Sequence, residues 1–278
     1  MTASALHVSP VQPDDLDAVT ELVKALRWPH RREDIGLFMR LGAGHTAKDD
    51  AGALQGVALW WAFEPAAARL GLVMVSPDCQ GRGIGRRLVE RILDDAGERS
   101  MMLLATEAGK PLYDKLGFRT VGACRQYQGT YEGRPQLAAD LRPATPNDMP
   151  AILALDRAAF GAGRTDALAA LRDIGRVAVI DGGAGITGYA IERMFGRGTV
   201  IGPIVAAGEE EAIRLFRALA LPGFVRVDAP VGFDGFAAFL ESQGLAAVGA
   251  DSPVMVRGSW PEPSDDARLF ALSSHALG

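Results

Sequence analysis

The sequence predicts a mixed α/β (α+β) protein with two tandem domains of similar fold, each a mixed, mostly antiparallel sheet flanked by helices. Length is the first reason, because 278 residues exceed the usual size of one domain. An internal repeat is the second, since residues 10–16 (PVQPDDL) return as 143–149 (PATPNDM). Both copies interleave helical and strand patterns, as a mixed sheet requires. We therefore expect domains at residues 1–135 and 136–278, joined by a polar linker at 129–135.

The first repeat shows alternating strand and helix patterns along its whole length. Helix 13–26 follows from apolar residues at Leu16, Val19 and Val23, directly after a proline suited to a first turn. In helix 83–96, Ile84 and Leu88 share an apolar face opposite a charged one. The expected order is strand 5–9, helices 13–26 and 31–40, strands 45–48, 54–63 and 69–75, helix 83–96, strand 101–105, helix 110–116, and a final strand or hairpin at 118–128.

Composition limits the classes of partner. Hydrophobic residues make up 48% and charged residues 23%, which is ordinary for a globular protein with full cores. A net charge of -5 disfavours nucleic acid and anionic membranes. The N-terminus lacks a leader pattern, and no apolar run is long enough to span a membrane. We expect a cytoplasmic protein that acts on a small molecule; the choice between monomer and homodimer stays open.

Only two cysteines are present, Cys79 and Cys124. Neither has a second cysteine or paired histidines nearby at metal-ligand spacing, so no metal site is expected. Cys79 could be a nucleophile, but no histidine or acid follows it at an informative position. We expect two reduced thiols.

A glycine-rich segment, residues 80–85 (QGRGIG), lies between an apolar strand and an amphipathic helix. Amides at a helix N-terminus carry partial positive charge, and glycine lets the backbone approach an anion closely. The segment lacks the lysine of a Walker loop, and its third glycine comes one residue early for a dinucleotide fingerprint. A phosphate-binding loop is therefore expected; the alternative is a strand-to-helix turn without a ligand.

Two motifs resemble those of the GNAT acetyltransferase superfamily. Residues 73–88 are similar to its acetyl-CoA signature, Arg/Gln-x-x-Gly-x-Gly/Ala, which Gln80, Gly83 and Gly85 match. Residues 112–118 (LYDKLGF) are similar to its second motif and follow at the expected distance. The resemblance covers residues 1 to about 130. It implies an N-acetyltransferase with acetyl-CoA as co-substrate.

The resemblance also implies roles for individual residues. Tyr113 occupies the position of the acid that protonates the departing thiolate; the alternative is a core tyrosine. Thr106 stands where many relatives carry a cofactor-binding asparagine. The residues expected to hold acetyl-CoA are Val73, Met74, Val75, Gln80, Gly81, Arg82, Gly83, Ile84, Gly85, Arg86 and Thr106.

The acceptor side is less defined. By resemblance, Trp28, His30 and Asp34 lie near the substrate, although a lone histidine is also common as a surface or core residue. No acid lies in strand 69–75, so the general base is undetermined. The expected acceptor is a primary amine of a small polar molecule, with a kasugamycin-type aminoglycoside as a specific example and polyamines or amino-acid derivatives open. Alternatives are a protein or peptide N-acetyltransferase and a non-catalytic acyl-CoA sensor.

The second repeat lacks the chemical parts of the first. Acidic residues 209–211 stand where phosphate would bind, and Leu240 falls at the position of Tyr113. The repeat resembles a degenerate GNAT-like domain that shapes the substrate pocket. Asp228, Glu192 and Asp251 are candidate contacts to a cationic amine, or else part of a solvated acidic surface. The apolar tail at 269–272 is expected to dock on a domain.

Overall fold

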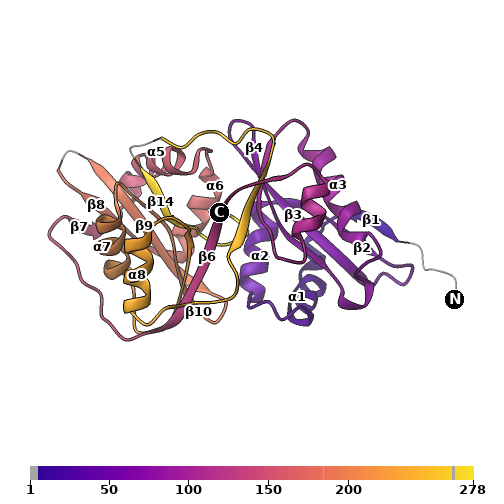
Figure 1. The fold of residues 1–278 in the computed structure, drawn as a ribbon, viewed down its shortest axis with the longest axis horizontal. Helices are drawn as coiled ribbons and strands as arrows, with labels where there is room; N and C mark the ends of the chain where they lie inside the picture. Colours follow the sequence, from indigo (N-terminus) through magenta and orange to yellow (C-terminus); the bar gives the residue numbers. More distant parts are fainter. Residues whose placement is uncertain (1–5, 184, 265–266) are drawn as a thin grey trace.

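The computed structural model describes residues 6–183, 185–264 and 267–278. Two halves lie side by side along the long axis, with the N-terminal half in indigo to magenta and the C-terminal half in pink to yellow (Figure 1). One mixed, mostly antiparallel sheet of 14 strands runs through both halves, and helices flank it. The predicted fold class is confirmed. Ala5, the start of the first predicted strand, lies outside the described residues.

The first half contains the elements that the sequence predicts. They are β1 (His7–Pro10), α1 (Leu16–Ala25), α2 (Arg32–Leu41), β2 (Ala43–Lys48), β3 (Leu54–Phe63), β4 (Ala67–Val75), α3 (Ile84–Ala96), β5 (Ser100–Leu104), α4 (Lys110–Lys115) and β6 (Arg119–Tyr131). Helix α1 begins three residues late because Pro13–Asp15 forms a 3₁₀ turn, closed by the Gln12 amide donating to the Asp15 carboxylate at 2.7 Å. The predicted linker at 129–135 is partly wrong, since β6 continues to Tyr131.

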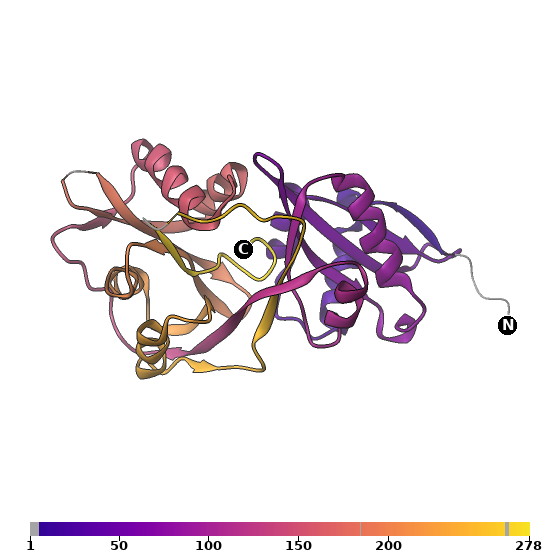
Figure 2. The same ribbon diagram turned by 45° about the horizontal axis from the view of Figure 1, so that its top comes forward.

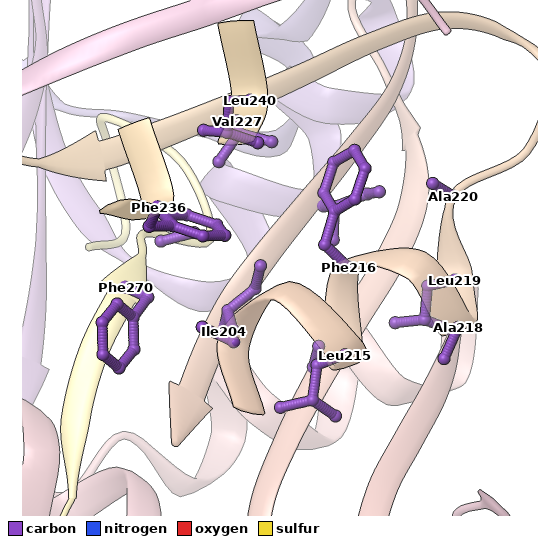
Figure 3. Close-up of a cluster of buried hydrophobic side chains, with 14 of the residues drawn as sticks. Ile204, Leu215, Phe216, Ala218, Leu219, Ala220, Val227, Phe236, Leu240 and Phe270 are labelled. Atoms are coloured by element: carbon purple, nitrogen blue, oxygen red, sulfur yellow. The ribbon is translucent and has the colours of Figure 1, made fainter. Parts of the chain in front are cut away.

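The second half repeats this order of helices and strands. Its elements are β7 (Leu141–Pro143), α5 (Met149–Phe160), α6 (Thr165–Ile174), β8 (Gly175–Asp181), β9 (Ile186–Phe195), β10 (Gly198–Ala206), α7 (Glu209–Leu219), β11 (Gly223–Pro230), α8 (Asp234–Ser242), β12 (Ala246–Ala247), β13 (Ser252–Arg257) and β14 (Arg268–Ala271). Phe216, Phe236 and Phe270 lie in its core, between α7, α8 and the sheet (Figure 3). Each is at most 1% exposed, so this half has a full hydrophobic core of its own.

Strands β4 and β5 separate soon after they start. They pair in parallel only from Ala67 with Ser100 to Arg69 with Met102. On its other edge β4 carries a bulge. In β3, Val57 pairs with Met74 and Leu59 pairs with Gly71, so two steps along β3 correspond to three along β4. Leu72, inside this bulge, has φ 50°. The edge of β4 beyond Arg69 is therefore free of a neighbouring strand and faces an opening in the sheet.

The two halves exchange strands. The sheet order β5-β13-β6-β11 places β13, from the C-terminal segment, between two strands of the first half. Strand β6 pairs with β13 near its start and with β11 from Cys124 to Tyr131. Figure 2 shows β6 and β13 crossing the middle of the molecule. The sheet is thus continuous, and the boundary after residue 135 stays a prediction.

In the second half, β14 fills the opening that stays free in the first. Strands β10 and β11 pair in parallel at two positions and then separate. Strand β14 pairs with β10 from Ile204 to Ala206, and the Leu272 amide donates to the Asp228 carbonyl of β11 at 2.8 Å. The predicted docking of the apolar tail is confirmed, and it takes place between two strands of its own half.

Candidate active site

The loop between β4 and α3 contains two glycines in left-handed conformation. Gly81 has φ 77° and Gly83 has φ 78°, a region that strains other L-residues. A Cβ at either position would meet no protein atom within 4 Å. The loop therefore requires glycine for its conformation, and its backbone is open to an approaching ligand.

Helix α3 begins at this loop with its first amides unpaired by side chains. Its first backbone hydrogen bond runs from the Arg87 amide to the Gly83 carbonyl at 3.1 Å. Among the described residues, no side chain caps this helix and no acid lies in its first turn. The free amides and the helix dipole both favour an anion here. A pyrophosphate group fits the loop on these grounds.

A cleft of about 600 Å³ runs from the loop along the open edge of β4. Of the residues predicted to hold acetyl-CoA, those that line it are Val73, Met74, Val75, Gln80, Gly81, Gly83, Ile84, Gly85, Arg86 and Thr106. Arg82 is exposed and is not among the lining residues. The Gln80 side chain donates to the Val75 carbonyl at 3.3 Å, which fastens the loop to the end of β4. The structure thus assembles nearly all of the predicted cofactor residues around one elongated cleft.

Tyr113 lines the same cleft from α4. It is 7% exposed and packs edge-on against Phe118, with ring centroids 5.8 Å apart. Burial raises the pKa of Tyr113 to about 12, so the phenol stays protonated at neutral pH and can donate. The Thr106 hydroxyl accepts the Gly109 amide at 3.1 Å, which orders the turn into α4. Thr106 therefore helps to position the helix that carries Tyr113.

A second pocket, of about 350 Å³, adjoins the cleft where β4 and β5 separate. Both cavities are lined by Gly71 and Leu72 of the β4 bulge, and by Leu104 and Thr106 across the opening. The remaining lining of the second pocket comes from both halves: Trp28, Pro29, His30, Gln126, Gln128, Arg197, Arg226, Val248, His275 and Ala276. The two cavities thus form one path with the bulge of β4 at its middle.

The three predicted substrate residues have different places. Trp28 lines both cavities, and His30 lines the second pocket, 5.9 Å from Trp28 between ring centroids. Burial, with Arg226 nearby, lowers the pKa of His30 to about 4, so this ring is neutral. Asp34 is not among the residues that line either cavity, and its role near the substrate stays a prediction. Its carboxylate is 2% exposed and accepts from Arg31 and from the Gly196 amide at 3.0 Å, so it joins α2 to the second half.

The three acids proposed in the second half are all paired with arginines. Glu192 pairs with Arg176 at 2.9 Å and Asp251 with Arg125 at 2.6 Å. Asp228 is fully buried and pairs with Arg226, so it is neither solvated surface nor a free acid. It lies directly behind His275, whose Nε2 is 3.3 Å from Asp228 Oδ1. His275 is a pocket residue that the sequence pattern did not single out, although it follows the apolar tail that was expected to dock.

In its described residues, the second half differs from the first at the places that form the cofactor cleft. Its helix α7 starts with Glu209, Glu210 and Glu211, where α3 has no acid. The Glu209 carboxylate accepts the Phe236 amide, so a side chain occupies the region near this helix N-terminus. Strand β14 occupies the opening beside β10. Both halves therefore share a fold, but in the second half a side chain and a strand occupy the places that line the cofactor cleft in the first.

Neither a membrane segment nor a metal cluster adds to this site. Across the described ranges, every helix is too short or too polar to cross a membrane. In the same ranges, no group of three or more metal-binding side chains comes together. The Cys79 thiol lines the cleft and donates to Gln55 Oε1 at 2.8 Å, while Cys124 is buried.

Two neighbouring strands that separate beside a glycine loop at a helix N-terminus are the arrangement expected of an acyl-CoA-dependent transferase. Two family models, each described as an acetyltransferase (GNAT) domain, match residues 42–120 and 152–271. The chain belongs to the GNAT N-acetyltransferases, with one family domain in each half. Acetyl-CoA is the usual acyl donor of this family.

Two relatives and one solved structure are similar to this chain. The uncharacterised N-acetyltransferase YitH of Bacillus subtilis (strain 168) is 31% identical over 219 residues, which cover 75% of this chain and 76% of YitH. The [ribosomal protein bS18]-alanine N-acetyltransferase of Escherichia coli (strain K12) is 36% identical over 73 residues, 24% of this chain and 49% of that enzyme. A candidate acetyltransferase from Pyrococcus horikoshii has the same fold, with a TM-score of 0.81 and 20% identity over 100% of this chain and 98% of its own.

Proposed function

We propose that this protein transfers the acetyl group of acetyl-CoA to a primary amine of a small polar molecule, by direct attack and without a covalent enzyme intermediate. The observation that carries the proposal is the meeting of two cavities at Gly71 and Leu72. One cavity ends at an anion-binding loop, and the other is a polar pocket between the halves. An acyl donor and an amine that enter from opposite sides would meet at the bulge of β4.

The chain supplies three functions on the donor side. Acetyl-CoA, when bound, brings a thioester that an amine can attack. The amides around Gly83 would hold its pyrophosphate, and the open edge of β4 would pair with the peptide-like pantetheine arm, as in strand addition. An amide of the β4 bulge would face the thioester oxygen, and a donor of this kind contributes about 2.7–4 kcal/mol to other acyl transfers. Tyr113 would protonate the departing sulfur.

The acceptor pocket favours a small molecule over a protein. It is a cavity of about 350 Å³ to which β6, β11 and the C-terminal segment contribute, so the second half covers the acceptor side. A protein substrate would instead need an open groove. The E. coli relative, by its name, acts on a ribosomal protein, but the similarity covers only 24% of this chain. A peptide acceptor is therefore the weaker of the two alternatives.

The charges of the pocket favour an acceptor that carries an anionic group. Arg197 and Arg226 are among its described lining residues, and no aspartate or glutamate is. A polycationic aminoglycoside would meet repulsion from Arg197, whereas the charge of Arg226 is balanced by its ion pair with Asp228. An amino-acid derivative, with an amine to react and a carboxylate to bind, is the class we propose. The kasugamycin-type acceptor and the cytoplasmic location stay predictions from the sequence.

A test of the function measures thiol release from acetyl-CoA against a panel of amino acids, amino sugars, aminoglycosides and polyamines. Tyr113→Phe should bind acetyl-CoA with an unchanged Kd and turn over about 100- to 10,000-fold more slowly, because the acid is lost. Tyr131→Phe is the control, since Tyr131 is also buried but packs on Phe216 in the second half. Equal turnover of Tyr113→Phe and wild type would refute the assignment of Tyr113 as the acid. A wild type that binds acetyl-CoA but turns over no amine would favour a non-catalytic sensor.

A further inference from the structure

The last residues of the chain pass through the middle of the molecule (Figure 2). Of these residues, His275 and Ala276 line the acceptor pocket. Arg69 of β4 is 1% exposed and donates to the carbonyls of His275 and Ala276 at 3.0 and 3.1 Å. Arg193 of β9 donates to the Ser273 carbonyl at 2.9 Å. The backbone around His275 is thus held from both halves, and by the strand that forms the cofactor cleft.

Polar atoms without a partner gather around this segment. Among the described residues, the buried side-chain atoms of this region that have no hydrogen-bond partner include His30 Nδ1, Arg193 Nε and Nη1, and Ser273 Oγ. Buried polar groups in folded proteins are usually paired. Of these residues, His30 lines the pocket assigned to the acceptor, so its free nitrogen is available to a polar ligand there.

His275 and Asp228 form a pair at the wall of the pocket. His275 Nε2 lies 3.3 Å from Asp228 Oδ1, at ion-pair distance. Burial alone would raise the pKa of Asp228, but His275 and Arg226 more than offset this and hold it well below its usual range. Arg226 donates two hydrogen bonds to Asp228, at 2.9 and 2.8 Å. Asp228 is therefore a fixed carboxylate, which favours the imidazole tautomer with its proton on Nε2.

This arrangement leaves the other ring nitrogen to accept a proton. Nε2 is buried, whereas the His275 side chain is 31% exposed, so the accessible part of the ring lies away from Asp228. The ring lines the acceptor pocket, and its neighbour Ala276 packs against Gly71, where a Cβ would lie 3.3 Å from Ala276 Cα. His275 is thus adjacent to the point where the two cavities meet.

We propose that His275 is the general base, accepting the proton of the acceptor amine at Nδ1 while Asp228 orients the ring. The inference rests on the proposed function and names the group that the sequence left undetermined. Nδ1 takes a proton from the acceptor ammonium, the freed nitrogen attacks the thioester carbon, and the second nitrogen proton leaves for solvent as the amide forms. The carbon–sulfur bond then breaks, and the sulfur takes the proton of Tyr113. The products are an amide and a free thiol, and solvent exchange restores both side chains.

Several charged or titratable groups surround His275. Asp228 faces Nε2, Arg226 and Arg197 line the same pocket, and His30 stands across it. Cys124 lies behind Asp228, and burial raises its pKa well above the usual value, so it adds no charge at neutral pH. His30 lacks a carboxylate at hydrogen-bond distance in the described structure, and it is the competing candidate that the experiment must separate.

The experiment compares His275→Gln, His30→Gln and wild type with the best amine from the panel, between pH 6 and 10. Glutamine keeps a donor for Asp228 but cannot accept a proton at neutral pH. We expect kcat of His275→Gln to fall about 100- to 10,000-fold at pH 7, with the Kd for acetyl-CoA unchanged. The deficit should narrow toward pH 10, where the amine, with a pKa of roughly 10, loses its proton without help. His7→Gln, at an exposed site, is the control.

The outcomes separate this inference from the function on which it rests. A wild type that binds acetyl-CoA but acetylates no amine would overturn both. An active wild type with a His275→Gln deficit below about threefold, or a deficit that does not change with pH, would overturn the role of His275 alone. A larger, pH-dependent deficit in His30→Gln would transfer the role to His30. If His275→Gln fails to fold, the test is instead whether added imidazole restores turnover to His275→Ala. Absence of rescue would overturn the role of His275 as the base.

Discussion

Replacing Gly83 by alanine tests the phosphate loop most directly. Gly83 has φ 78°, and an L-residue there costs about 1–2 kcal/mol of stability. For a chain of this size, that corresponds to a fall in Tm of about 2–8 °C. The added methyl meets no protein atom within 4 Å, but Gly83 lines the cleft, so the methyl would stand where phosphate approaches the amides. Losing one hydrogen bond to a charged group costs about 1.5–3 kcal/mol, or roughly a 10- to 150-fold weaker Kd.

Gly52→Ala provides a matched control for this change. Gly52 has φ 80°, and a Cβ there also meets nothing within 4 Å, but it lies in the turn between β2 and β3, away from both cavities. Both variants should lose similar stability in thermal unfolding. In calorimetric titration with acetyl-CoA, only Gly83→Ala should bind more weakly. If both variants bind as tightly as wild type while Tm falls equally, the loop is a structural turn and the pyrophosphate assignment is refuted.

Two further changes test the packing that holds the site. Asp34→Asn should lower the free energy of unfolding by about 1.5–3 kcal/mol at pH 7, because it weakens charged hydrogen bonds to Arg31 and Gly196. The folded state lowers the pKa of Asp34, so wild type should exceed Asp34→Asn in stability by the whole amount above about pH 4. The difference in Tm between the two proteins should disappear as the pH falls further. Phe270→Ala should lower the free energy of unfolding, measured in urea, by about 3–5 kcal/mol, because Phe270 is 1% exposed. Its Kd for acetyl-CoA should equal that of wild type. Weaker binding of acetyl-CoA would contradict the view that the second half has a core of its own.

Local patterns were enough to predict the donor side of the site. Helix α3 was expected at 83–96 and runs from Ile84 to Ala96, because its apolar spacing and its glycine start are both encoded within one segment. Tyr113 was placed by a motif of seven residues that forms one short helix and the turn after it. Both predictions depended on residues close together in the chain, where spacing determines which face a side chain occupies.

Features created by distant contacts were not visible in the sequence. Leu72 adopts φ 50° within the β4 bulge, yet leucine carries no local signal for that conformation. Strand β13 carries a short apolar run, and nothing in its residues shows that it pairs with β5 of the other half. Asp34 was read as an acid near the substrate, but its partner amide belongs to Gly196, 162 residues away. Each of these features depends on a contact between distant residues that only the assembled sheet determines.

The C-terminal segment has two structural roles: it fills the opening beside β10 in the second half, and it lines the acceptor pocket. Strand β14 pairs with β10 in the opening where the first half would bind the arm of acetyl-CoA, so the second half is closed by its own chain. Leu272 then bonds to β11, and this fixes the direction in which the chain continues. The next residues run toward β4, where Arg69 holds them and His275 lines the acceptor pocket. One segment thus fills the opening beside β10 in the second half and lines the pocket that we assign to the acceptor, which is why we propose that the second half takes part in acceptor binding.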